Sequence, residues 1–234
     1  MTLNTEKSTF TIFKSRRKDI PNLPDKIAFL DFEIKRTPYI KFLGLTLDEN
    51  LSWNHHIDDV CNKLKSFFHI FYNIRDYLAK KEIQSIYYAL VYSRIIYGIN
   101  VYGHAGPTKM EKLQVLQNKL LKVLSEKKYR YPTEKLHKEF ELLLVEDLAK
   151  QELLTFVHNF FSNSLPPIFD NYFDTFDHPY QTRNGSKSIR IRNHSSEMAA
   201  TSVLVKGATL WNALDIRFKN ISKRKNFRAQ FKTD

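Results

Sequence analysis

Residues 39–57 constrain the fold more than any other stretch of this chain. They begin as a strand-like run that is interrupted by one glycine, Gly44, and they continue into an acidic turn around Asp48. Ser52 or Asn54 then suits the N-cap of a helix, because its side-chain oxygen can accept a bond from the first turn. The stretch therefore predicts a junction at which a small sheet ends and a helical region begins.

Apolar residues recur at three- and four-residue intervals after this junction, the pattern of helices that bury one face. In the first helix, Leu64, Phe67, Phe68 and Phe71 are expected to face a core. The expected helices cover residues 54–78, about 81–102, 113–124 and 133–164, the last ending before Pro166 and Pro167. Short connections between them favour an antiparallel bundle.

The region before the junction is rich in β-forming residues. Residues 9–13 alternate, residues 27–34 resemble a tight hairpin around Leu30 and Asp31, and residues 39–47 form a further strand-like run. These runs predict a small antiparallel sheet, which needs a helix or a partner on one face to be stable. The expected fold class is α+β and mostly α, with the small N-terminal sheet followed by an antiparallel helical bundle.

The end of the chain is polar and basic. From residue 180 onward twelve cations stand against three anions, so nine of the twelve net positive charges lie there. We expect an extended arm over about 177–197 and a helix over 199–219, anchored by Trp211 and Leu214. The predicted organisation is residues 1–53, residues 54–176, and a basic segment, 177–234, that is partly extended and partly helical.

Charge and cysteine content narrow the functional classes. A formal charge of +12 and a pI near 9.6 favour a polyanionic partner, most often nucleic acid. The only cysteine, Cys61, excludes an intrachain disulfide and a cysteine-based zinc site, which suggests a reducing, intracellular setting in the cytoplasm or nucleus. No apolar run resembles a signal peptide or is long enough to span a bilayer, so we expect no membrane association.

Several short motifs occur in one order along the chain. Asn4, Lys7 and Ser8 precede the first strand-like run, and Phe42, Leu43 and Gly44 form the glycine turn. The later motifs are Tyr97-Gly98, Tyr102-Gly103, Leu113 with Leu116-Gln117, Leu165-Pro166-Pro167, Thr182-Arg183, Gly207 with Leu210-Trp211-Asn212, and residues 227–232. As an ordered set they resemble the C-terminal part of the reverse transcriptase of LINE-type (non-LTR) retrotransposons: the end of the palm, the thumb and the C-terminal region. Tyr102 stands where that family usually has tryptophan.

The resemblance implies a role in holding RNA or DNA. Lys7 matches the lysine of palm motif D, which is proposed to assist nucleotidyl transfer, and the glycine turn matches motif E, the primer grip. Backbone contacts of this kind carry no sequence preference, and no small-molecule substrate is expected. The residues that we expect to contact nucleic acid are Lys41, Phe42, Leu43, Gly44, Lys63, Lys65, Arg183, Arg190 and Arg192.

The same resemblance implies that the chain by itself is inactive as an RNA-directed DNA polymerase. Full-length members bind two Mg²⁺ through aspartates of palm motifs A and C, the latter a Tyr-x-Asp-Asp turn, and these motifs are expected upstream of Met1. The one aspartate pair here, Asp58 and Asp59, lies in a helical pattern, where neighbours point about 100° apart and share a metal poorly. His55 and His56 likewise do not converge on one ion, so we expect no metal or other cofactor in this chain.

Two other identities remain open from the sequence. A host protein that retained the helical module for nucleic-acid binding or protein interaction would show the same motifs, and so would a gene product without function. Genomic DNA upstream of the Met1 codon discriminates between them: an in-frame Tyr-x-Asp-Asp and an endonuclease indicate a transposon, whereas a host promoter and unrelated exons indicate a retained module.

Overall fold

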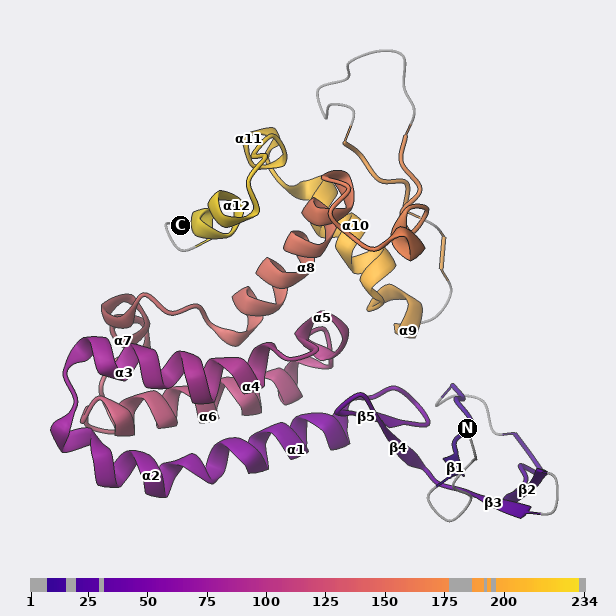
Figure 1. Ribbon diagram of the computed structural model, residues 1–234, viewed down its shortest axis with the longest axis horizontal. Helices are drawn as coiled ribbons and strands as arrows, with labels where there is room; N and C mark the ends of the chain where they lie inside the picture. The colour runs from indigo at the N-terminus through magenta and orange to yellow at the C-terminus, as the bar shows by residue number, and fades with distance from the viewer. Residues whose placement is uncertain are drawn as a thin grey trace. The chain divides into compact units, whose positions relative to one another are not determined.

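The computed structural model describes residues 8–15, 20–29, 32–176, 187–191, 193–194 and 197–231. A small β-region precedes a large helical region, so the chain is α+β and mostly α, as the sequence predicted (Figure 1). The chain divides into two compact units, Met1–Lys63 and Leu64–Asp234. Within the described residues, no helix has both the length and the apolar character that crossing a membrane requires.

The first unit contains two small sheets. In one, β2 (Lys26–Phe29) and β3 (Phe32–Arg36) form the expected antiparallel hairpin, with Phe29 paired to Phe32. The strand β1 (Thr9–Phe10) joins the other edge of β3, but in parallel, so this sheet is not purely antiparallel. The other sheet is the antiparallel hairpin of β4 (Tyr39–Phe42) and β5 (Leu45–Asp48). Residues 39–47, expected as one strand-like run, are thus divided between two strands that reverse at Leu43 and Gly44.

The first predicted helix is divided at Ser66. It forms α1 (Asn54–Lys65), α2 (Phe67–Ile74) and a short 3₁₀ turn, Arg75–Tyr77. Leu64 and Phe71 are fully buried, as predicted, while Phe67 and Phe68 are only half-buried. In the second unit α2 packs against α6 (Pro107–Leu124), so Phe71 faces the bundle core.

The second predicted helix keeps one face buried through an unusual turn. Ile83, Tyr87, Val91, Ile95 and Ile99 recur every fourth residue, and all are buried. An α-helix rotates such a series by about 40° per step, which would carry it off the core. The π-helical turn η3 (Tyr87–Tyr92), between α3 (Lys80–Ile86) and α4 (Ser93–Ile96), has more residues per turn and offsets that drift. The helix α5 (Ile99–Tyr102) follows.

The predicted helix over 133–164 is two helices, α7 (Thr133–Phe140) and α8 (Val145–Phe161). Glu141 takes a left-handed conformation (φ 53°) and ends α7. Side chains of α6 stabilise the break, because Gln114 Oε1 accepts a bond from the Val145 amide at 2.7 Å and Gln117 Nε2 donates to the Leu143 carbonyl at 3.2 Å. This interruption depends on long-range contacts, and periodicity alone does not reveal it.

The basic C-terminal segment contributes to a core of its own. It contains α9 (Glu197–Ala200), α10 (Val203–Ala213), α11 (Ile216–Lys219) and α12 (Arg224–Gln230), and both α10 and α12 pack on α8 (Figure 1). Trp211 and Phe227 are fully buried there beside Val157. Ser202 caps α10 by accepting a bond from the Val205 amide, so the helix expected over 199–219 is interrupted near both ends.

Candidate nucleic-acid interface

The turn between β4 and β5 has the geometry of a tight hairpin. Leu43 and Gly44 are its two loop residues, with φ of 45° and 80°, and Phe42 pairs with Leu45 beneath them. Positive φ at both loop positions characterises a type I′ turn, whose twist matches that of the flanking strands. Glycine adopts this conformation without strain, so the single glycine noticed in the sequence fixes where the chain reverses.

The hairpin presents apolar and cationic side chains to solvent. Phe42 is 60% exposed and Leu43 is 74% exposed, and Lys41 beside them is also exposed. Tyr39, at the other end of β4, is half-exposed. Four of the predicted contact residues, 41–44, therefore lie together on one accessible turn. Large apolar side chains at such a position are typical of a surface that binds a partner.

A buried carboxylate, Asp48, joins this hairpin to α1. Its Oδ1 accepts bonds from the amides of Asn50 at 3.1 Å and Ser52 at 3.0 Å. Its Oδ2 accepts from the Ser52 hydroxyl and the Trp53 amide, both at 3.0 Å. Leu51 and Trp53 have left-handed φ values of 49° and 62°, a conformation that costs about 1–3 kcal/mol at a non-glycine residue. Asp48 offsets that cost and holds the junction in one geometry.

We expect Asp48→Ala to destabilise the first unit by about 3 kcal/mol, because a carboxylate that accepts several bonds is removed and three partly buried amides lose their acceptor. Denaturant unfolding monitored by tryptophan fluorescence, to which Trp53 and Trp211 both contribute, measures the change. Asp25→Ala, at an exposed position before β2, is the matched control and should change stability by less than about 0.5 kcal/mol. Equal stability of the two variants would contradict the role given to Asp48.

Buried polar contacts also link β5 to the first turns of α1. The Thr46 amide donates to His56 Nδ1 at 3.3 Å, and the Thr46 hydroxyl donates to Asp59 Oδ2 at 2.8 Å. Burial lowers the pKa of His56, against an opposing effect of Asp59. The imidazole is therefore neutral near pH 7, as an Nδ1 acceptor must be. His56 and Asp59 position the hairpin on the helix.

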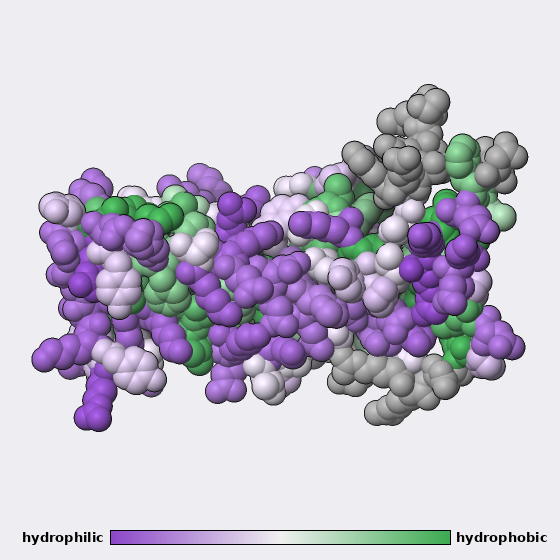
Figure 2. Space-filling view, turned by 90° about the horizontal axis from the view of Figure 1, so that it is seen from below, coloured by the Kyte–Doolittle hydropathy of each residue, from purple (hydrophilic) through white to green (hydrophobic). Residues whose placement is uncertain are grey.

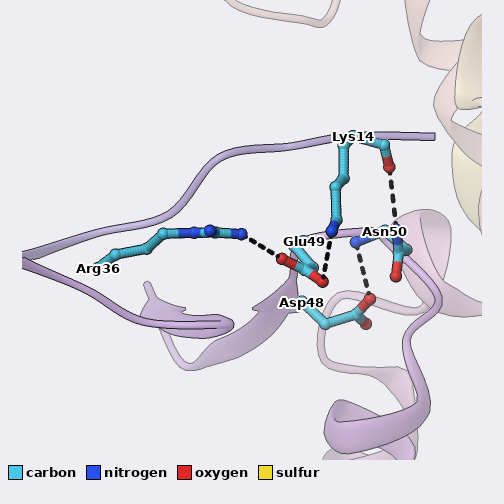
Figure 3. Close-up of polar contacts among 5 residues, drawn as sticks. All are labelled: Lys14, Arg36, Asp48, Glu49 and Asn50. Carbon is cyan, nitrogen blue, oxygen red and sulfur yellow. Dashed lines mark hydrogen bonds and ion pairs between the residues drawn. The ribbon is translucent and has the colours of Figure 1, made fainter. Parts of the chain in front are cut away.

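Ionic contacts attach the first described segment to the same junction (Figure 3). Glu49 pairs with Lys14 at 3.5 Å and with Arg36 at 2.8 Å, in partly buried positions. Asn50 Nδ2 donates to the Lys14 carbonyl at 3.1 Å, and the Lys14 amide donates to the Glu49 carbonyl at 2.8 Å. No sequence pattern indicates the roles of Lys14, Arg36 and Glu49. Only Asn50 and Ser52, two and four positions after Asp48, indicate the turn locally.

The remaining predicted contact residues are spread over other elements. Lys63 and Lys65 are exposed on α1, and exposed Arg190 lies over the Phe176 ring, 5.1 Å from its centroid. Lys7, Arg183 and Arg192 lie outside the described residues. The structure thus groups residues 41–44, and the other assignments stay predictions.

The aspartate pair lies on α1, in a helix as the sequence predicted, but after its first turn, which contains no acidic residue. Asp59 is engaged with Thr46, and among the described residues no group of three histidine, cysteine, aspartate or glutamate side chains is arranged to hold a metal ion. The geometry gives Asp59 a role in the junction with β5.

No family model matches this chain, and no solved structure does. Curated relatives do match this chain. The chain is 22% identical over 148 residues to a probable RNA-directed DNA polymerase from transposon X-element of Drosophila melanogaster, covering 62% of this chain and 16% of the relative. It is 26% identical over 110 residues to that from transposon BS of the same species, covering 46% and 12%. It is 27% identical over 128 residues to the RNA-directed DNA polymerase from mobile element jockey of Drosophila funebris, covering 53% and 14%.

The matched part of this chain thus corresponds to about one seventh of each relative's length. All three relatives are described as polymerases of mobile elements, the same class of protein that the ordered motifs of the sequence resemble. They confirm the predicted resemblance: this chain is similar to the RNA-directed DNA polymerases of non-LTR retrotransposons.

Proposed function

We propose that this chain holds the primer–template of a non-LTR retrotransposon RNA-directed DNA polymerase, as the piece that contains the end of its palm, its thumb and its C-terminal region. The observation that carries the proposal is the β4–β5 hairpin, whose exposed tip at residues 41–44 is mounted on the buried Asp48 anchor. The polymerase relatives support the same assignment.

The hairpin tip offers complementary groups to a nucleic-acid strand. Lys41 supplies a cation for a phosphate, while Phe42 and Leu43 offer apolar surface to a sugar or an unstacked base. Gly44 has no side chain to keep a backbone at a distance. Contacts to phosphate and sugar fix position without reading bases, so binding through this tip is independent of sequence.

We also propose that the chain by itself does not polymerise DNA. Two-metal nucleotidyl transfer needs carboxylates that hold the attacking and leaving oxygens together. The printed sequence contains no Tyr-x-Asp-Asp motif, and its one aspartate pair lies on a helix with Asp59 bonded to Thr46. On this proposal, the chain does not supply the carboxylates that would bind the two Mg²⁺ ions of the full-length family.

One fluorescent RNA–DNA hybrid tests both proposals, namely that the hairpin tip binds nucleic acid and that the chain by itself does not polymerise DNA. Lys41→Glu with Phe42→Ala is expected to weaken binding by about tenfold or more, since a phosphate contact becomes a repulsion and a stacking contact is lost. Lys35→Glu, an exposed lysine on β3 with the same charge change, should weaken it by about twofold or less. Fluorescence anisotropy gives both values, and primer extension with Mg²⁺ or Mn²⁺ should give no product.

Equal loss in the two variants would move the binding surface away from the hairpin. Templated extension by the purified chain would contradict the second statement. Strong preference for one sequence would favour the retained host module instead.

A further inference from the structure

A pocket of about 330 Å³ lies within the second unit, remote in sequence from the β4–β5 hairpin. It is formed by η3, the connection between α7 and α8, the first turns of α8, and α12. Its volume is at the small end of the range for ligand pockets. A duplex does not fit such a space, whereas one small planar molecule does.

Three tyrosines of η3 give the pocket an aromatic wall. Tyr87, Tyr88 and Tyr92 line it, with Tyr88 edge-on to each of the other two at ring-centroid distances of 5.6 and 5.1 Å. Two of the hydroxyls already have partners, since Gln117 Nε2 donates to Tyr87 and Arg228 Nη2 donates to Tyr92 at 3.0 Å. Tyr87 is itself almost fully buried, so the rings of the half-buried Tyr88 and Tyr92 offer most of the aromatic surface, and Leu148 adds aliphatic surface.

The helix α12 adds two cations in different states. Arg228 is ion-paired to Glu152 as well as bonded to Tyr92, so its charge is balanced within the protein. Lys225 is exposed and also lines the pocket, and no carboxylate of the described residues pairs with it. The pocket thus combines an aromatic wall with one uncompensated positive charge. That combination fits a planar aromatic ring that carries an anionic group.

We propose that this pocket binds a single unpaired nucleotide, with the base against the tyrosines of η3 and the phosphate at Lys225. Aromatic side chains bind bases of any sequence because every base has a π face, and an ammonium pairs with phosphate as a point charge. The site is separate from the proposed hairpin contact, so either can fail without the other. The shared chemistry is a nucleoside monophosphate unit, free or within a strand.

Adenosine monophosphate is the probe for an NMR titration of the full chain. Lys225→Glu should weaken its binding by about tenfold, the effect of turning a partly exposed ion pair into a like-charge contact. Lys119→Glu, an exposed lysine on α6 that does not line the pocket, is the matched control and should change affinity by about twofold or less. Adenosine lacks the phosphate, so it should bind wild type more weakly than the monophosphate does, but less weakly than the monophosphate binds Lys225→Glu, where a repulsion is added.

A second variant removes the space and leaves the charge in place. Ala229 lines the pocket but is exposed, so Ala229→Trp should be tolerated by the fold and should abolish detectable binding. Displacement of the probe by an octamer of adenylate, at lower concentration than its free monomer, would assign the site to a strand; monomer binding without displacement would assign it to a free nucleotide. No binding by wild type, or equal binding by wild type, Lys225→Glu and Ala229→Trp, would overturn the proposal.

Discussion

Trp211→Ala is expected to cost the second unit about 4–6 kcal/mol, most of the stability of an ordinary domain. The side chain is fully buried and stacks on Phe161 at 5.2 Å between ring centroids, and Phe227 lies 6.2 Å away. Its indole N–H donates to the Lys187 carbonyl at 2.8 Å. Truncation leaves a cavity between α8, α10 and α12 and removes the donor from that carbonyl, so both losses act together.

Trp211→Phe separates the two contributions, because it keeps an aromatic ring in the core but removes the N–H. It should cost about 1–3 kcal/mol, for the missing bond and the smaller ring. Guanidinium unfolding followed by circular dichroism at 222 nm measures both variants. If Trp211→Ala changed stability by no more than an exposed substitution such as Tyr129→Ala, the C-terminal helices would not be part of the folded core.

The sequence predicted the parts of the fold that local pattern controls. The buried positions of α6, including Leu113, Leu120 and Leu124, follow directly from their spacing. The β4–β5 reversal follows from Gly44, because a single glycine between two β-prone runs marks the position of positive φ. In each case one short stretch contains all the information that the structure uses.

Long-range contacts decide what the sequence did not predict. The break between α7 and α8 depends on Gln114 and Gln117 of α6, which no pattern within 133–164 contains. In the basic C-terminal segment the sequence predicted a helix anchored by Trp211, but it did not predict that α8 would be the partner or that Phe227 would join the same core. The aromatic positions of α8, such as Phe161, were a signal for that partner, but they gave no indication of which segment would cover them.

The same distinction applies to the candidate site. The tip, residues 41–44, was predictable because its motif is local, whereas the reason for its rigidity was not. In the sequence, Asp48 was recognisable only as part of an acidic turn. In the structure its carboxylate accepts hydrogen bonds from three amides of the strand–helix junction. Glu49 binds Lys14 and Arg36 from segments that lie 35 and 13 residues earlier in the chain.

The C-terminal charge is only partly available to a nucleic acid. Lys219 is buried and donates to the Asn212 carbonyl at 3.2 Å, and burial lowers its pKa. Arg228 is paired with Glu152. Arg217, Lys223 and Arg224 are exposed, by contrast. Deleting the whole segment would remove Trp211 and Phe227 from the core, so a test of its electrostatic role requires substitutions at the exposed cations.

We expect the affinity of this chain for a short RNA–DNA duplex to fall steeply with salt, and the Arg217→Gln, Lys223→Gln, Arg224→Gln variant to show a shallower dependence. Each phosphate contact contributes a log–log slope of about −0.9 on duplex DNA through released counterions, so losing three such contacts should reduce the slope by about 2 to 3. A second variant, Lys128→Gln, Arg130→Gln, Lys135→Gln, makes the same charge change at exposed sites around the start of α7. Fluorescence anisotropy between about 50 and 200 mM salt gives the slopes. The slope counts contacts with phosphate, because each contact releases counterions. Both variants remove three positive charges. Equal slopes would therefore show that net charge, rather than the surface around α11 and α12, controls binding.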